Sequence, residues 1–371
     1  GSLKPPIGNR LRQILIILSL FLFSSTVISC SSKSDGGSST TSTTTDDNTT
    51  TTDNTTTTDN TTTTDNTTTT DNTTTSSSDN SSSSVSVLFV GVGASGNIVR
   101  SNDNGASWDN ATSPTGNDFR GVGFGNNTFV AVGNNGNIVR STDNGSTWDN
   151  VTSPTTSTTN LSKVTFGNNT FLAVGNNGNI VRSTDNGSSW DNATSPTAIH
   201  LNGVTFGNNT FVGVDVSGNI VRSTDNGSFF DNATNSNASM LLGVTFGNNI
   251  FVGVGYSGNI VRSTDNGSSW DNATSPTDTH LYGVTFGNNT FVAVGLSGNI
   301  VRSTDNGSSF DNATNSNTTS LLRVTFGNNT FVAVGLLGNI VRSTDNGSSW
   351  DNATSPTSNH LYGVTGVTFS E

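Results

Sequence analysis

The side chains that could carry acid–base, nucleophilic or metal chemistry are scarce in this chain, and they recur at regular intervals. The three histidines, His200, His280 and His360, lie 80 residues apart. The only cysteine is Cys30 and the only glutamate is Glu371. A zinc site needs its ligands about 2 Å from one centre, whereas residues copied at the same place in successive repeats are spread apart. We therefore expect no bound metal and no cofactor.

The arginines and carboxylates offer no catalytic pair. Seven arginines occupy one repeated position: Arg100, Arg140, Arg182, Arg222, Arg262, Arg302 and Arg342. Beyond the N-terminal segment, only Arg120 and Arg323 fall outside this pattern. Arg302 falls opposite Asp311 across a predicted hairpin, and this register predicts a cross-strand ion pair. Glycoside hydrolysis needs two carboxylates at a defined separation, and none is recognisable here. The pattern argues against an enzyme.

The regular spacing of these residues comes from an eight-residue sequence motif that occurs seven times. Its copies begin at Ser101, Ser141, Ser183, Ser223, Ser263, Ser303 and Ser343, and most read STDNGSSW or a close variant. The successive intervals are 40, 42, 40, 40, 40 and 40 residues. A period near 40 residues is typical of a four-stranded propeller blade, which cannot bury its apolar faces without neighbouring copies.

The residues of this motif can stabilise a turn by themselves. Its aspartate can accept hydrogen bonds from backbone N–H groups further along, its glycine permits positive φ, and its final aromatic residue can pack between blades. The aspartates are Asp103, Asp143, Asp185, Asp225, Asp265, Asp305 and Asp345. The glycines are Gly105, Gly145, Gly187, Gly227, Gly267, Gly307 and Gly347. The aromatic residues are Trp108, Trp148, Trp190, Phe230, Trp270, Phe310 and Trp350.

This S-x-D-x-G-x-x-W pattern resembles the Asp-box (BNR-type repeat) of sialidases, sortilin-type receptors and the photosystem II assembly factor family. The resemblance covers the whole repeat region and implies a β-propeller. It also implies that the box is a fold element on the face away from an active site. A sialidase-like site would need an arginine triad, a Tyr–Glu pair and an acidic Asp, and the single glutamate, Glu371, makes such a site hard to build.

Each period contains four β-prone runs, a to d, separated by turn residues. In one copy these are residues 282–286, 290–294, 299–303 and 309–314. The repeat region opens with VSVLFVGVG, which aligns with run b, and it ends with LYGVTGVTFSE, which aligns with run a. The last strand should therefore complete the first blade, with its register open by about three residues. We predict an all-β, seven-bladed propeller of four-stranded antiparallel blades over residues 85–371.

The segment before the propeller has the composition of an export signal and a tether. Lys4, Arg10 and Arg12 precede an apolar run at 14–23 that is short for a membrane span. The sequence VISC ending at Cys30 resembles the bacterial lipobox. It implies a signal peptide at 1–29 and lipidation of Cys30; a plain signal peptide or an uncleaved anchor are the alternatives. Residues 30–84 are nearly all Ser, Thr, Asp and Asn, so we expect a disordered tether. Ser31 favours the outer membrane in the common sorting rule.

Differences between the copies gather in two connections. The a–b and c–d turns barely vary, whereas the b–c turns and d–a connections do, and these two should emerge on the same face. Several of their residues are large or apolar: Tyr256, Tyr282, Leu296, Leu336, Leu337 and His280. Exposed apolar residues on one surface indicate a partner site, although loops also vary by drift.

Together these features predict a surface-exposed lipoprotein with a monomeric, non-catalytic binding or scaffold head for a protein or glycan. A net charge of −12 argues against nucleic acid as the partner, and the membrane is reached only through the lipid. A multivalent lectin, with sugars beside Trp190, Trp270 and Trp350, is one alternative. A sialidase-like glycoside hydrolase is the other.

Overall fold

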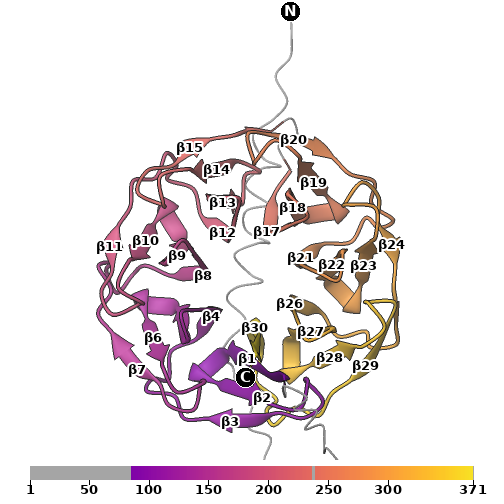
Figure 1. Ribbon diagram of the computed structural model, residues 1–371, viewed down its shortest axis with the longest axis horizontal. Coiled ribbons are helices and arrows are strands. Elements are labelled where there is room, and N and C mark those ends of the chain that lie inside the picture. Colours follow the sequence, from indigo (N-terminus) through magenta and orange to yellow (C-terminus); the bar gives the residue numbers. More distant parts are fainter. Residues whose placement is uncertain (1–84, 236–238, 371) are drawn as a thin grey trace, which may run out of the picture. The chain divides into compact units, whose positions relative to one another are not determined.

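The structure, a computed structural model, describes residues 85–235 and 239–370. The predicted signal peptide, Cys30 and the predicted tether lie outside these residues, as does Glu371. In the described part, seven small antiparallel sheets stand around a central axis (Figure 1). We number the blades by the order of their boxes and letter their strands a to d from the axis outward.

The three inner strands of each blade repeat with nearly constant lengths. The a strands are β30 (Leu361–Ser370), β4 (Phe119–Gly125), β8 (Leu161–Gly167), β12 (Leu201–Gly207), β17 (Leu241–Gly247), β21 (Leu281–Gly287) and β26 (Leu321–Gly327). The b strands are β1 (Val85–Gly93), β5 (Thr128–Gly133), β9 (Thr170–Gly175), β13 (Thr210–Asp215), β18 (Ile250–Gly255), β22 (Thr290–Gly295) and β27 (Thr330–Gly335). The c strands are β2 (Ile98–Ser101), β6 (Ile138–Ser141), β10 (Ile180–Ser183), β14 (Ile220–Ser223), β19 (Ile260–Ser263), β23 (Ile300–Ser303) and β28 (Ile340–Ser343).

The outer strands are shorter. The d strands are β3 (Asp109–Ala111), β7 (Asp149–Val151), β11 (Asp191–Asn192), β15 (Asp231–Asn232), β20 (Ser269–Asn272), β24 (Asp311–Asn312) and β29 (Ser349–Asn352). Six b–c turns are single 3-10 turns: η1 (Ala94–Gly96), η2 (Asn134–Gly136), η3 (Asn176–Gly178), η4 (Tyr256–Gly258), η5 (Leu296–Gly298) and η6 (Leu336–Gly338).

The prediction of one continuous outer strand per blade, such as 309–314, was wrong. The chain pairs with its own blade only at β24 and then crosses to the next blade. There β25 (Thr314–Asn315) lies parallel to β29, and β16 (Thr234–Asn235) lies parallel to β20 in the same way. The tail of each of these blades therefore extends the sheet of its neighbour, which satisfies edge groups that a short strand would leave exposed.

The predicted closure of the ring is confirmed. Strand β30, at the end of the chain, pairs antiparallel with β1, so the first blade is built from both ends of the described region (Figure 1). The register is Phe89 opposite Gly366 and Leu88 opposite Val367. Gly366 stands where the other a strands have phenylalanine. The strand runs straight on from there because β1 begins early enough to pair with residues 367–370.

The hydrophobic core lies between blades, not within them. One cluster joins Val292 and Val294 of blade 6 to Leu321, Phe331 and Trp350 of blade 7, and all five are buried. Equivalent clusters join the other neighbouring blades. Since the b strands are buried along their whole length against both neighbouring blades, a single blade is unstable alone and the ring must close.

Candidate functional site

The repeated box folds as the hydrogen-bonded turn that its residues predict. In blade 1, Ser101 Oγ donates to Asp103 Oδ1 at 2.7 Å, and the backbone N–H of Gly105 donates to Ser101 Oγ at 3.0 Å. The N–H of Ser107 donates to both Asp103 oxygens at 3.0 Å. Gly105 has a φ of 80°, in the region that favours glycine. The aspartate thus fixes the turn through its carboxylate.

These hydrogen bonds change the pKa of the box aspartates. Partial burial alone would raise the pKa of Asp103, but hydrogen bonds from Ser107, Ser101 and the backbone N–H of Ala106 outweigh it, and the pKa falls to about 2. The same balance lowers the pKa to about 2 in five other boxes, at Asp143, Asp185, Asp265, Asp305 and Asp345. The pKa of Asp225 is also lowered. Each carboxylate is occupied as a structural acceptor.

The box aromatics face the core. Trp190, Trp270 and Trp350 are 6%, 2% and 4% exposed, and the indole N–H of each donates to the carbonyl of its own box glycine at 3.1 Å. The four other box aromatics, Trp108, Trp148, Phe230 and Phe310, are buried as well. A sugar has no access to stack on these rings, so the lectin sites envisaged beside the three tryptophans do not form.

The repeated arginines reach across blades. Arg302 does lie opposite Asp311 in the c–d register, as predicted. The expected ion pair is wrong, because the one ion pair found in residues 85–235 and 239–370 joins Arg120 to Asp118. Arg182 instead donates to the Asn226 carbonyl at 3.1 Å, in the box turn of the next blade. The guanidinium turns toward the neighbouring blade, away from the carboxylate beside it.

The two faces of the ring are defined by hydrogen bonds between turns. On one face, the amide of Asn248 in an a–b turn donates to Asn306 Oδ1 in a c–d turn at 3.0 Å. On the other, the backbone N–H of Ser95 in a b–c turn donates to Asp118 Oδ1 in the d–a connection of the next blade at 2.9 Å. We call the second the variable face, because its b–c and d–a connections differ most between blades.

The histidines hold turns on the variable face. His280 Nδ1 accepts from the N–H of Ser257 at 3.0 Å, and His360 Nδ1 accepts from the N–H of Leu337 at 2.9 Å. His200 bonds instead through Nε2 to Ser162 Oγ at 2.8 Å. Among the described residues, no three His, Cys, Asp or Glu side chains come together as a metal site.

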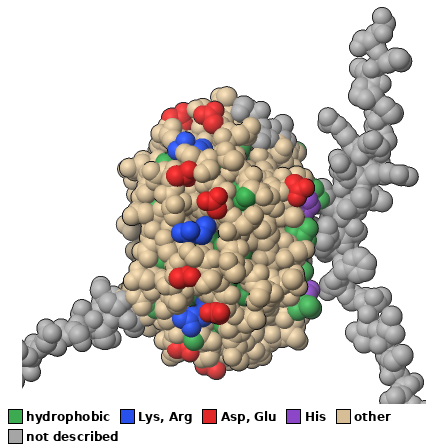
Figure 2. Space-filling view, turned by 90° about the vertical axis from the view of Figure 1, so that its right-hand side faces the viewer, with side chains coloured by type: hydrophobic (Ala, Val, Ile, Leu, Met, Phe, Trp, Pro, Cys, Tyr) green, Lys and Arg blue, Asp and Glu red, His purple; other side chains and the backbone are tan. Residues whose placement is uncertain are grey.

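The apolar residues predicted for this face are less exposed than the sequence indicated. Tyr256, Leu296 and Leu336 are partly buried at the first position of their turns. Tyr256 stacks on His280, with ring centroids 3.5 Å apart and an interplanar angle of 25°. Leu337 is the exception, at 68% exposed. Figure 2 shows histidine and apolar side chains together along one edge of the disc, and Arg and Asp side chains on the outer rim.

Two further exposed apolar residues were missed. Ile199, 37% exposed, lies in the d–a connection of blade 4, next to His200 on the variable face. Phe229, 49% exposed, lies in the box of blade 4 on the opposite face. Phe229 takes the place of a serine or threonine that the other six boxes have at this position, and that departure was visible in the sequence.

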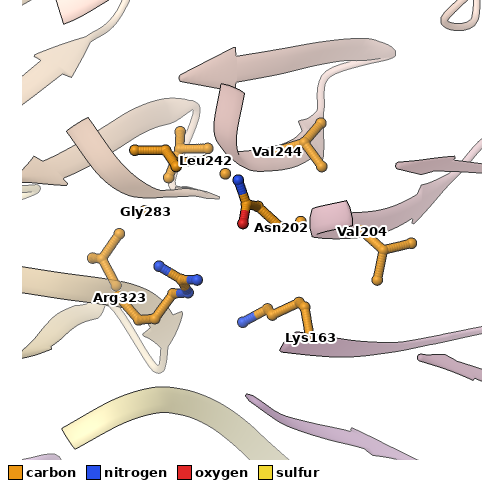
Figure 3. A pocket seen from close by; sticks show the side chains of 11 residues that line it. Lys163, Asn202, Val204, Leu242, Val244, Gly283 and Arg323 are labelled. Carbon is orange, nitrogen blue, oxygen red and sulfur yellow. The ribbon is translucent and has the colours of Figure 1, made fainter. Parts of the chain in front are cut away.

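The sequence analysis also did not identify a group of cationic side chains that lie near the axis of the ring. Every a strand has a β-bulge at its second residue, which is skipped in the pairing with strand b. The third residue is glycine in five blades, but it is Lys163 in blade 3 and Arg323 in blade 7. Figure 3 shows both side chains and that of Asn202 directed into one cavity lined by five successive a strands.

We call this cavity the axial channel. Positive charges beside it lower the pKa of their cationic neighbours. Burial, and then the positive charge of Arg323, lower the pKa of Lys163 to about 7. Burial, and then Arg120, lower the pKa of Arg323 to about 10. Arg120 lies 4.4 Å over the ring of Tyr362 and is paired with Asp118. In an acidic protein this is a local concentration of positive charge.

Seven boxes on seven four-stranded blades define an Asp-box, or BNR-type, β-propeller. A sequence profile of the family described as "Photosynthesis system II assembly factor YCF48" matches residues 86–342. This is more than half of the chain, and the chain belongs to that family. None of the curated proteins compared with the chain matches it.

Solved structures agree in fold. The structure "YCF48 bound to D1 peptide" is 17% identical, with a TM-score of 0.57, and the alignment covers 68% of this chain and 86% of that one. "YCF48 from Cyanidioschyzon merolae" is 18% identical, with a TM-score of 0.54, covering 68% and 90%. A chain of the "Mitotic Checkpoint Complex" is 9% identical, with a TM-score of 0.56, covering 67% and 81%. At these identities the likeness concerns the fold alone.

No helix within residues 85–235 and 239–370 is long and apolar enough to cross a membrane.

The box of blade 4 gives a pH-dependent prediction. In the other boxes a hydroxyl at this position donates to the aspartate, as Ser189 does to Asp185. Phe229→Ser should add this bond, lower the pKa of Asp225 further and stabilise the fold by up to about 1 kcal/mol, allowing for solvent. A carboxyl whose pKa is depressed by folding stabilises the protein above its unfolded pKa, and this gain is lost as pH falls through the folded value.

The measurement is the melting temperature at pH 7 and pH 2, with Phe229→Ala as the control that removes the ring without adding a hydroxyl. We expect the melting temperature of Phe229→Ser to exceed that of Phe229→Ala at pH 7, and this advantage to be much smaller at pH 2. An equal advantage at both values would show that the hydroxyl does not act through Asp225.

Proposed function

We propose that the propeller is a non-catalytic binding head that holds a protein partner on its variable face. The observation that carries this proposal is Leu337. It is 68% exposed and has a φ of 57°, so an apolar side chain is presented to solvent from a left-handed backbone position. A left-handed conformation is unfavourable for a leucine, and an exposed leucine adds no burial. Neither feature benefits the isolated fold.

The same position in other blades shows what the fold itself prefers. It holds Asn135 and Asn177 in blades 2 and 3, and small serines with positive φ in blades 1, 5 and 6. Asparagine is the non-glycine residue best suited to this conformation. The turn geometry is otherwise the same, because the N–H of Asn135 donates to Asn160 as that of Leu337 does to His360. The leucine is therefore a departure that stability does not explain.

Apolar turns occupy one sector of the variable face. The first turn residue is Ala94, Asn134 and Asn176 in blades 1 to 3, and Val216, Tyr256, Leu296 and Leu336 in blades 4 to 7. Tyr282, in the a strand of blade 6, lies beside His280, with ring centroids 6.4 Å apart. An apolar sector with aromatic residues at its edge suits a protein surface, where such residues are enriched.

The comparisons support a protein partner. The family to which the chain belongs is described as an assembly factor, and one related propeller is bound to a peptide. The described residues contain no glutamate, so the Tyr–Glu pair of a sialidase-like site is absent from them. These points favour binding over hydrolysis.

The partner prediction compares two faces of one protein. Leu337→Asn should reduce recovery of bound proteins from a membrane extract of the source cells at least tenfold, because it removes the exposed apolar side chain. It should also raise the free energy of unfolding by up to about 1 kcal/mol. Recovery is measured by quantitative mass spectrometry with the full chain as bait.

Phe229→Ser is the matched control, since it removes an exposed apolar side chain from the opposite face. Its recovery should equal that of the unaltered chain. If Phe229→Ser loses the partners and Leu337→Asn keeps them, the proposed face is wrong.

We further propose that the head belongs to an exported bacterial lipoprotein, lipidated at Cys30 and held at the outer membrane by residues 30–84. The support is the lipobox-like VISC sequence after a basic and apolar start. Stable anchoring needs at least two acyl chains, which lipoprotein processing supplies. Cys30→Ser should therefore move the protein from the membrane pellet to the supernatant after an alkaline wash. A variant that stays in the pellet would contradict lipid anchoring.

A further inference from the structure

The third residue of the a strands has little room, because the backbone of the next blade lies close to it. In five blades it is glycine, and at Gly283 an added Cβ would lie 2.9 Å from the Leu322 carbonyl oxygen of the next blade. Lys163 and Arg323 put the two longest cationic side chains at this narrow position. The ring closes without side chains here in most blades, so these two are not needed to fill it.

The two cations have little compensation in their surroundings. Arg323 is held by one nitrogen, Nη1, which donates to the carbonyls of Tyr282 and Leu322 at 2.8 and 2.7 Å. The Lys163 ammonium has no hydrogen bond or ion pair among the residues that the structure describes. The cavity between them is lined otherwise by glycine, valine, leucine and Asn202, with no carboxylate. Partly buried charges without a partner are unfavourable.

We propose that Lys163 and Arg323 form a binding site for a single carboxylate group in the axial channel. They come from blades 3 and 7, so their side chains converge across the channel (Figure 3). The cavity between them is about 30 Å³, room for about two waters or for the two oxygens of one carboxylate. An arginine and a lysine are the two side chains best suited to such an anion.

Asn202 positions the site. Its side-chain NH₂ donates to the Leu241 carbonyl at 3.0 Å, which fixes the amide and leaves Oδ1 toward the cavity on the side of Lys163 (Figure 3). An amide oxygen repels a carboxylate but attracts an ammonium group, so Asn202 favours the charged form of Lys163 and does not itself bind the anion. This site is separate from Leu337, and it stands or falls independently of the proposed partner face.

Anion binding should depend on pH because Lys163, with a pKa of about 7, must be protonated to bind the anion. Binding near neutral pH is therefore accompanied by proton uptake by Lys163. The pKa values of the neighbouring His200, Tyr282 and Tyr362 are shifted away from the range between pH 7 and 9. Burial and Arg120 lower the pKa of His200, so it stays neutral. Burial raises the pKa of Tyr282 and Tyr362. Asp118 is paired with Arg120. Since only the protonated lysine binds, affinity at pH 9 should be on the order of 50-fold weaker than at pH 7.

The chain suits a direct measurement, because it has only three lysines: Lys4, Lys33 and Lys163. With lysine labelled at ¹³Cε, the full chain gives three NMR signals, and Lys163→Met identifies the one from the channel. Without added anion this signal should titrate near pH 7. Acetate at constant ionic strength should raise the apparent pKa of Lys163, while the neutral isostere acetamide should not.

The variant Arg323→Met tests two roles of Arg323 separately: lowering the pKa of Lys163 and binding the anion. Removing the neighbouring positive charge should raise the pKa of Lys163 even without acetate, and it should weaken acetate binding at least tenfold. A purely structural arginine would leave acetate binding unchanged. The proposal is overturned if acetate and acetamide shift the Lys163 signal equally, or if acetate binds Arg323→Met as well as it binds the unaltered chain.

A second pair of probes distinguishes the source of the carboxylate. Acetyl-triglycine carries its carboxylate at a chain end, and its C-terminal amide is the control. Tighter binding of acetyl-triglycine than of acetate, lost in the amide, assigns the site to the end of a peptide. Binding of acetate alone assigns it to a small free carboxylate. If neither anion moves the Lys163 signal, the site does not exist.

Discussion

Pairing of β1 with β30 closes the ring, and the packing between all seven blades depends on that closure. The apolar clusters lie between blades, so each blade is stabilised only if both of its neighbours are present. The first blade takes its a strand from the end of the chain and its other three from the start. Nine paired positions between the two strands join these ends. Closure makes all seven blades interdependent and requires nearly the same structure from each.

That requirement divides the molecule into a part that must repeat and a part that is free to differ. The boxes lie on one face and at the rim, where their aspartates serve as acceptors and their aromatics fill the core. The b–c and d–a connections on the other face, and the side chains directed into the axial channel, are not needed for closure. Leu337, Lys163 and Arg323 all belong to this second part. Each departs from the majority of blades in a way that is unfavourable for the isolated fold.

Much of the fold could be predicted because the repeat carries it. Seven boxes predicted seven blades, and the offset between the first and last strands predicted the shared blade. Three expectations failed for physical reasons. The outer strand divides because its last residues pair with the next blade. Arg302 forms no ion pair with Asp311 although the two are opposite, and at the equivalent position Arg182 bonds to the box turn of the next blade. Tyr256 and its equivalents are half-buried because they pack onto the next d–a connection.

The axial cations show a different limit. Lys163 and Arg323 were visible as departures from glycine, but their meeting across the channel depends on ring geometry and on the bulge in every a strand. Neither the ring geometry nor the bulge can be predicted from the sequence of a single blade. The central claim is that residues breaking the repeat serve binding at the expense of stability. The direct test is the melting temperature at pH 7 of a triple variant that introduces residues found at these positions in other blades, Lys163→Gly, Arg323→Gly and Leu337→Asn. We predict a higher melting temperature than that of the unaltered chain, whereas a lower one would show that these residues hold the propeller together.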